Sequence, residues 1–308
     1  MQIYIFQLIK IKFNVLKMKQ YFHYCSKGLK GDILFASPVE FLAGMNRVAI
    51  CYLICLRNGR KVLIISFCLM DNHVHFILFG TRADCDAFVS TYKKLTGMWV
   101  KKHRGERLHE EIEFGGFPIR DKDDMKEKIA YVLRNPVSAG METTVEGYNW
   151  STGMLMFNQC ELLLQNATPA HAFGVREKRL ITNSKDAIPD NWLFFKNGMI
   201  WPGSYTEATV AMRQFNSLRD YMYMINDRRI DKKVNEEMLK DSLSIPDGEL
   251  RDHANVLAKD LFGKDRISMC SPKERLSVCR VLKNEYRAGA KQLARAVGLP
   301  REKLEAMV

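Results

Sequence analysis

The sequence predicts an α+β fold in which helices cover a small antiparallel sheet, followed by an all-α C-terminal segment. The apolar run Lys61–Leu69 turns at Met70–Asn72 into a second apolar run that ends at Gly80, which is the pattern of a central hairpin. Helical patterns with capping signals lie before and after this hairpin. Residues 264–308 form further helical patterns and carry eleven Lys or Arg against five Asp or Glu.

Two elements are expected before the hairpin. Gln20–Cys25 is a short run rich in aromatic residues and predicts a strand. Ser37–Glu40 is a capping box with proline at the first helical position, so a helix is expected to follow. Asn58-Gly59 ends this helix, and Leu56 is its expected last residue.

The hairpin carries the most informative pair of residues in the chain. His73 and His75 are separated by one valine, and side chains two apart in a strand share a face. Two adjacent imidazoles are able to bind one divalent cation, and they prefer Mn, Fe, Ni or Zn to Mg. The alternative is a strand with two solvent-facing histidines.

A second long helix follows the hairpin. Thr81–Asp84 caps it, and the pattern continues to Lys102. Its C-terminal part is basic, which is typical either of a solvated helix face or of a surface that follows a phosphate backbone. The basic residues are Lys93, Lys94, Lys101, Lys102, His103, Arg104 and Arg107.

A third helix is expected from Asp121 to about Pro136. Its apolar stripe consists of Met125, Ile129, Val132 and Leu133. Tyr131 and Asn135 are four residues apart and share a face roughly 120° away from that stripe. The spacing therefore places them outside the core, as a candidate site or as ordinary amphipathic surface residues.

Composition restricts the class of protein and its compartment. The 308 residues carry a formal net charge of +12, which favours a polyanionic partner such as nucleic acid over a merely soluble basic protein. The eight cysteines form no C-x-x-C pair, so a reducing, cytoplasmic compartment is expected. No apolar run is expected to be long enough to span a membrane.

Four segments are expected along the chain. Residues 1–17 are an apolar leader; either translation starts at Met18 or the leader is a loosely held extra strand. Residues 18–158 form the α+β domain, and 159–262 is a connecting region with helical patterns near Glu207–Asn216 and Gly248–Phe262. Residues 263–308 contain a capped helix, a short helix to Gly298 and a second short helix, which predicts a DNA-binding helix-turn-helix or an ordinary helical tail.

These motifs resemble those of the REP-associated tyrosine transposases, members of the IS200-like, HUH-endonuclease superfamily. The segments that carry the resemblance are Met70–Phe76, Tyr131–Gly140 and Tyr148–Ser151, in the family's order and spacing. The resemblance implies a ferredoxin-like (RRM-like) sheet with helices, the HUH endonuclease fold. It also implies a homodimer, with a monomer as the alternative.

The resemblance further implies the roles of the site residues. Tyr131 would be the nucleophile, and His73, His75 and Asn135 would hold a divalent metal, Mg or Mn. The expected partner is single-stranded or hairpin (REP-like) DNA in the cytoplasm, associated with the nucleoid. The expected DNA contacts are Lys93, Lys94, Lys101, Lys102, Arg104, Lys291, Arg295, Arg301 and Lys303.

Two functions from different classes remain open from the sequence. The first is a metal-dependent tyrosine transposase that cleaves and rejoins DNA through a 5′-phosphotyrosine. The second is a catalytically inert or domesticated DNA-binding regulator that uses the C-terminal helix-turn-helix.

Overall fold

The structure is a computed structural model that describes residues 19–26, 33–105, 114–157, 164–165, 167–241, 247–286 and 290–300. The chain divides into two compact units, Met1–Asp231 and Lys232–Val308. The predicted leader, residues 1–17, lies outside the described residues, and so does Arg107. The boundary between the units falls inside one helix, α9 (Arg229–Asp241), and not at a predicted segment boundary.

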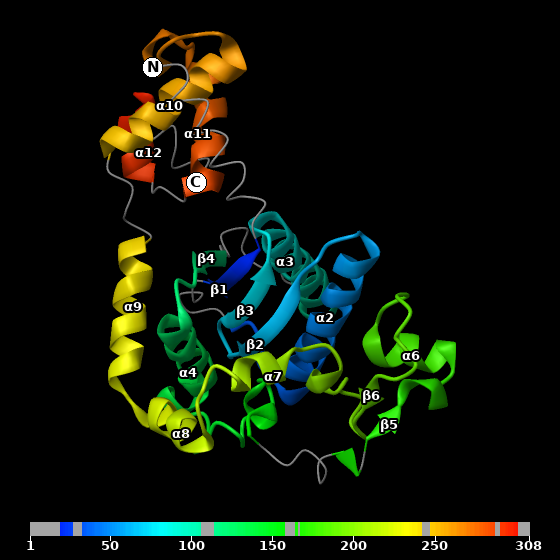
Figure 1. The fold of residues 1–308 in the computed structure, drawn as a ribbon. Coiled ribbons are helices and arrows are strands. Elements are labelled where there is room, and N and C mark those ends of the chain that lie inside the picture. Colours follow the sequence, from blue (N-terminus) through cyan, green and yellow to red (C-terminus); the bar gives the residue numbers. More distant parts are fainter. Residues whose placement is uncertain are drawn as a thin grey trace. The chain divides into compact units, whose positions relative to one another are not determined.

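A four-stranded antiparallel sheet lies at the centre of the first unit (Figure 1). Its spatial order is β2-β3-β1-β4, and every neighbouring pair is antiparallel. The predicted strand and hairpin are confirmed. The four strands are β1 (Gln20–Ser26), β2 (Leu63–Leu69), β3 (Val74–Gly80) and β4 (Phe114–Pro118).

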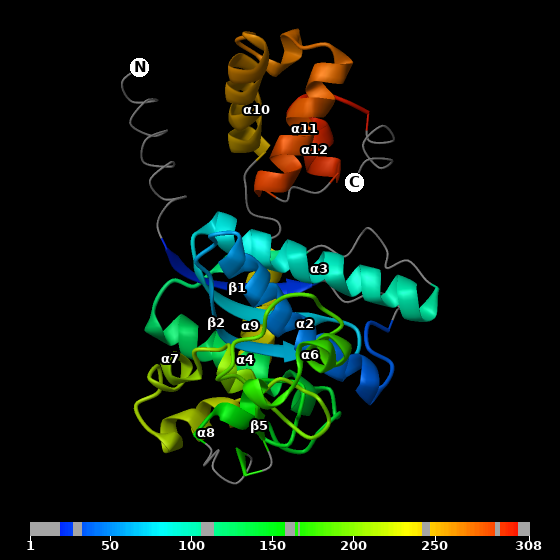
Figure 2. The same cartoon turned by 90° about the vertical axis from the view of Figure 1, so that its right-hand side faces the viewer.

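Two long helices, α2 (Pro38–Arg57) and α3 (Arg82–Arg104), cover one face of this sheet (Figure 2). Both begin where the capping signals predict, because the Ser37 and Thr81 side chains accept hydrogen bonds from backbone N–H groups of the first turn. Phe76 of β3 packs on this side, with its ring 5.2 Å from the ring of Tyr92. The alternation along β3 therefore leaves His75 on the other face.

By length and composition α2 is apolar enough to cross a membrane, with a mean hydropathy of 1.6 in its most apolar window. The expectation that no apolar run reaches that length is wrong for this helix. More than half of the window, 56%, is buried inside the fold, and a core helix meets the same criterion. Asn46 and Arg47 interrupt the run with polar groups.

The helix α4 (Lys122–Ser138) packs on the opposite face, against β2 and β3. Its N-cap is Asp121, as predicted. The predicted end near Pro136 is confirmed, since the helix ends two residues later at Ser138. Pro136 has no backbone N–H to donate to the carbonyl of Val132, four residues earlier, and only Val137 and Ser138 follow it in the helix. The backbone N–H of Ala139 then donates to the carbonyl of Asn135 and closes the helix.

The aromatic segment Tyr148–Ser151 extends the edge of the sheet. The backbone N–H of Leu69 donates to the carbonyl of Trp150 at 2.9 Å, and the Tyr148 hydroxyl donates to the carbonyl of Leu69 at 2.8 Å. Trp150 also stacks on Phe41 of α2. This segment therefore covers the otherwise open edge of β2.

The predicted connecting region contributes to both units. Ala170, Trp192 and Phe194 belong to the core of the first unit, and the helices α8 (Leu218–Asn226) and α9 were not expected from the sequence. The helical pattern near Glu207–Asn216 shortens to α7 (Ala208–Met212). The elements here are η1 (Gly153–Leu155), β5 (Thr168–Pro169), η2 (Ala170–Ala172), α6 (Val175–Thr182), β6 (Leu193–Phe194), η3 (Pro202–Ser204), α7 (Ala208–Met212), α8 (Leu218–Asn226) and α9.

The second unit has a small helical core of its own. Leu250 and Ala254 pack with Leu282 and Leu293, which joins three helices. Gly298 has a φ of 65° and forms the predicted turn after the last of them. The predicted second helix of the helix-turn-helix lies mostly outside the described residues. The elements are α10 (Asp247–Phe262), η4 (Ile267–Met269), α11 (Pro272–Tyr286) and α12 (Ala290–Val297).

Candidate active site

The two histidines of the sequence motif lie together at the start of β3. Asp71 and Asn72 form a tight bend, closed by a 2.8 Å hydrogen bond from the backbone N–H of Met70 to the carbonyl of His73. His73 therefore stands just before the strand and His75 inside it. Their rings meet edge to face with centroids 4.8 Å apart, so the predicted proximity is confirmed.

Asn135 of α4 reaches this pair from the facing helix. Its Nδ2 donates to the Tyr131 carbonyl at 3.0 Å, and its Oδ1 lies 3.4 Å from the Nε2 of His73. The Nδ1 of His73 lies 2.6 Å from the Oδ1 of Asn72 and is placed to donate to it. With that proton on Nδ1, the Nε2 carries a lone pair toward the Asn135 oxygen.

His23 of β1 is a third histidine in the site, which the sequence analysis did not select. Its Nε2 lies 3.2 Å from the Nδ1 of His75, and both rings are fully buried. In the part of the chain that the structure describes, the Nε2 of His75 has no hydrogen-bond partner. Burial is the main cause that lowers the pKa of His23 to about 3, and the nearby Lys128 contributes in the same direction. Burial also lowers the pKa of His75 well below 6.5, so both rings are neutral.

Tyr131 lies against these histidines. Its ring meets the His75 ring at 5.4 Å and the His23 ring at 5.8 Å, both edge to face, and the residue is only 6% exposed. The expectation that Tyr131 lies outside the core is wrong, because the sheet covers this face of α4 as well as the apolar stripe. Burial raises the pKa of the phenol, while the Asn135 side chain acts in the opposite direction.

Lys128 adds a charge to the same face of α4. It lies three residues before Tyr131, is 3% exposed, and its Nζ is 3.6 Å from the Oδ1 of Asp124. The sequence signal for Lys128 was its position three residues before Tyr131 in the predicted helix. For His23 the signal was a polar residue flanked by Phe22 and Tyr24 in an aromatic strand.

The donor set fits a divalent cation. The lone pair on His73 Nε2 and the Asn135 Oδ1 are two acceptors that face each other, and the buried Nε2 of His75 lacks a partner within the described ranges. Two imidazole nitrogens and one amide oxygen suit Mn better than Mg. Among the described residues no group of three or more His, Cys, Asp or Glu is arranged to hold a metal, so the asparagine is essential to this set.

The predicted DNA contacts differ in their surroundings. Lys94, Lys101 and Lys102 are exposed on α3, and Arg295 is exposed on α12. Arg104 instead binds Glu40 and the backbone carbonyls of Ile33 and Leu34. Lys93 is partly exposed, the side chain of Lys291 is not described, and Arg301 and Lys303 lie outside the described residues.

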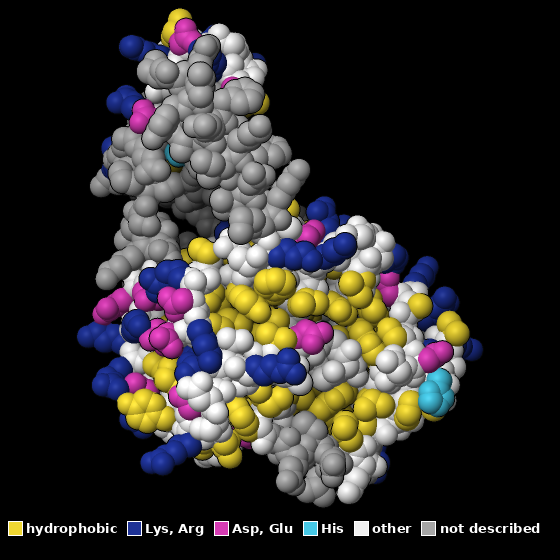
Figure 3. Space-filling view, in the orientation of Figure 1, with side chains coloured by type: hydrophobic (Ala, Val, Ile, Leu, Met, Phe, Trp, Pro, Cys, Tyr) yellow, Lys and Arg dark blue, Asp and Glu magenta, His cyan; other side chains and the backbone are white. Residues whose placement is uncertain are grey.

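The view of the first unit in Figure 3 shows where the charges lie on one face. Apolar side chains extend across the middle of this face, and Lys and Arg side chains are distributed around them. The excess of positive charge is therefore spread over this face and is not confined to one patch.

Comparisons with known proteins were made with the whole chain. No family model matches it, and no curated protein matches it. One solved structure with some similarity is described as "Structure of the REP associates tyrosine transposase bound to a REP hairpin", at 16% identity and a TM-score of 0.32. The match covers 44% of this chain and 76% of that one. A likeness at this level carries no inference about activity.

Proposed function

We propose that this chain is a metal-dependent single-tyrosine transposase or endonuclease that cleaves and rejoins single-stranded or hairpin DNA through a 5′-phosphotyrosine. The observation that carries the proposal is the convergence of His73, His75, Tyr131 and Asn135 from two elements about 60 residues apart in the chain. These are the residues that the sequence motifs select for metal binding and nucleophilic attack.

The finer fold assignment belongs to the same proposal. The strand order β2-β3-β1-β4, with α2 between β1 and β2 and α3 between β3 and β4, is the arrangement of a ferredoxin-like sheet. We assign this chain to the HUH endonuclease fold on that order and on the position of the histidines. A homodimer in the cytoplasm, associated with the nucleoid, completes the proposal.

His73, His75 and Asn135 would hold the divalent metal, which when bound supplies Lewis-acid polarisation of the scissile phosphate. Asn135 is held for this task by its hydrogen bond to the Tyr131 carbonyl. His23 holds His75 so that its Nε2 remains available.

Tyr131 would attack the phosphorus atom with its phenolic oxygen. The new P–O bond to tyrosine forms as the bond to the 3′ oxygen breaks, the phenolic proton passes to solvent, and the leaving oxygen takes up a proton as a free 3′-hydroxyl. Because the phosphodiester energy is kept in the tyrosine link, a 3′-hydroxyl is able to reverse the step and rejoin the strand.

One observation favours the second candidate, an inert DNA-binding regulator. Tyr131 is nearly buried, and burial raises the pKa of its phenol, whereas a nucleophile needs access to the substrate and a lowered pKa. In that case the histidine cluster is a structural core, and the second unit carries the function.

Incubation with labelled hairpin DNA and Mn or Mg distinguishes the transposase from the inert DNA-binding regulator. We expect the wild-type chain to cleave the hairpin and the double variant His73→Ala/His75→Ala to lose cleavage while its circular dichroism stays unchanged. His171→Ala is the matched control, because that histidine is exposed and far from the site in the sequence. A double variant that cleaves as well as wild type would overturn the metal assignment.

A further inference from the structure

Arg47 lies in the middle of α2 with its charge almost completely enclosed. The residue is 6% exposed, and its Nε donates to the Oγ1 of Thr96 on α3 at 3.2 Å. Both terminal guanidinium nitrogens are buried and have no hydrogen-bond partner among the described residues. The guanidinium lies over the Trp99 ring, 5.0 Å from its centroid, which compensates only part of the lost hydration.

An unpaired guanidinium in this position is costly. Arginine stays protonated in proteins, so it does not escape the cost of burial by losing its proton. The carboxylate that acts on it is that of Glu40, which is already bound by Arg104 and by the backbone N–H of Ala36. The described residues therefore leave the charge of Arg47 without a dedicated counter-ion.

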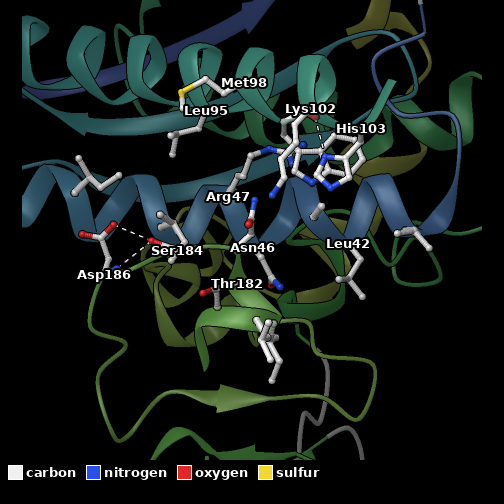
Figure 4. Close-up of a pocket in the computed structure, with 18 residues that line it drawn as sticks. Leu42, Asn46, Arg47, Leu95, Met98, Lys102, His103, Thr182, Ser184 and Asp186 are labelled. Carbon is white, nitrogen blue, oxygen red and sulfur yellow. Dashed lines mark hydrogen bonds between the residues drawn. The ribbon is translucent and has the colours of Figure 1, made fainter. Parts of the chain in front are cut away.

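Arg47 borders a cavity of about 560 Å³ between α2, α3 and the segment that contains α6 (Figure 4). Lys102 and His103 line the same end, and His103 stacks on Trp99 with ring centroids 4.2 Å apart. Asp186, the one acidic residue in the described lining, is engaged by Arg57 and Ser184.

Most of the remaining lining is apolar, with aliphatic side chains from Val39, Leu42, Ile50, Ile54, Leu95 and Ile181. Polar lining residues are Asn46, whose amide is bound to the backbone of Gly198 and Ile200, and Thr182, Asn183 and Ser184. The cavity thus joins a cationic end to an apolar wall, and its volume lies in the range of small-molecule sites. A ligand that satisfies both parts carries one anionic group on an apolar body.

We propose that this cavity binds a small amphiphilic anion, with a carboxylate or phosphate at Arg47 and an apolar body along the aliphatic wall of α2 and α3. The anion would accept hydrogen bonds from the two guanidinium nitrogens that have no partner, and Lys102 would add a second positive charge. This site is separate from the histidine cluster and does not depend on the proposed DNA chemistry, because the cavity lies on the face of the sheet opposite to α4.

Two kinds of ligand carry an anionic group on an apolar body, and a separate probe represents each of them. Decanoate presents a carboxylate on an aliphatic chain, and thymidine monophosphate presents a phosphate on a nucleoside. Inorganic phosphate presents the anionic group without an apolar body. We expect at least one of the two amphiphilic probes to bind the full-length chain in isothermal titration calorimetry, and inorganic phosphate to bind more weakly.

Variants then test the position of the anion. Arg47→Met removes the charge and keeps an apolar side chain, and affinity should fall about 10- to 100-fold with the loss of charge-assisted hydrogen bonds. Ala43→Phe fills the cavity while leaving Arg47 in place, and it should weaken binding as well. Arg60→Met is the control, because Arg60 is an exposed arginine just after α2 and does not line the cavity.

Binding of decanoate alone, or of the nucleotide alone, supports the proposal and assigns the source. Equal binding of inorganic phosphate would overturn the requirement for an apolar body. Absence of binding by all three probes, or affinity unchanged in both Arg47→Met and Ala43→Phe, would overturn the site.

Discussion

The Nε2 of His23 lies 3.2 Å from the Nδ1 of His75, across the neighbouring strands β1 and β3. The two rings stack with centroids 5.3 Å apart and an angle of 25° between their planes. One of the two nitrogens must carry the proton that they share. When the Nδ1 of His75 donates this proton to His23, the Nε2 of His75 keeps a lone pair for a metal. Metal-binding histidines commonly donate their other ring N–H to a hydrogen-bonding partner in this way.

We therefore predict that His23 is a positioning residue for the metal site. His23→Phe keeps a ring of similar size and removes the acceptor nitrogen, and Mn affinity should fall about 10- to 100-fold. His23→Gln keeps an acceptor and should retain most of the affinity. Calorimetric titration of the metal-free chain with Mn measures both. Equal Mn affinity in His23→Phe and wild type would contradict the role. If the His23 ring served only to fill space, phenylalanine would replace it better than glutamine, which is the opposite order of Mn affinities.

A second prediction concerns Arg104, a predicted DNA contact that the structure places in a network with Glu40. Arg104→Met should reduce the free energy of unfolding by about 1–3 kcal/mol, because it removes charge-assisted hydrogen bonds to a mostly buried carboxylate. Lys101→Met, one turn away and exposed, should leave stability unchanged. Urea denaturation of the two variants checks this, and equal stabilities would mean that the network contributes nothing.

The same network predicts a pH dependence. The hydrogen bond from Arg104 is the main cause that lowers the pKa of Glu40 below 4.5. A carboxyl group with a lowered pKa stabilises the fold above its unfolded pKa, and this contribution is lost as the pH falls through the folded value. Glu40→Gln should therefore be less stable than wild type at pH 7, and the difference should shrink below about pH 4.5. A difference that stays constant with pH would contradict the assignment.

A third prediction concerns the second unit. A chain that ends at Asp241 removes α10, α11 and α12 together, whereas a cut at Lys264 would leave Leu250 and Ala254 of α10 without their partners. The shortened chain should bind hairpin DNA more weakly and with a smaller salt dependence, because the removed residues 242–308 carry thirteen Lys or Arg against nine Asp or Glu. Some cleavage should remain at high protein concentration. An unchanged affinity and salt slope in binding assays at several salt concentrations would exclude a DNA-binding role for this unit.

Much of the fold was predictable because its signals are local. The caps at Ser37, Thr81 and Asp121 are encoded within four residues, and the structure places the N-cap hydrogen bonds where they were expected. The shared face of His73 and His75 follows from their spacing alone. The proximity of Tyr131 and Asn135 to these histidines was predictable only from the order of the family motifs. The spacing of residues within α4 does not show what the helix packs against.

The remaining features depend on tertiary packing. Periodicity placed Tyr131 outside the core, but the sheet covers a second side of α4 and buries it. His23 is 52 residues from His75, and only the register of β1 on β3 brings them together. The cavity beside Arg47 requires α6, which is more than 100 residues from α2 in the chain. No local pattern reports such contacts.

The central claim is that Tyr131 is the nucleophile, and the most direct measurement is covalent capture. Hairpin DNA labelled on its 3′ side is incubated with Mn and either wild type or Tyr131→Phe, and a protein–DNA adduct is sought by denaturing electrophoresis and mass spectrometry of the linked peptide. Phenylalanine keeps the ring contacts with His23 and His75, so stability and DNA binding should barely change. We predict an adduct on Tyr131 in wild type and neither adduct nor cleavage in the variant. Cleavage by Tyr131→Phe at the wild-type rate, with a free 5′ phosphate on the product, would show that water is the nucleophile and would contradict the account.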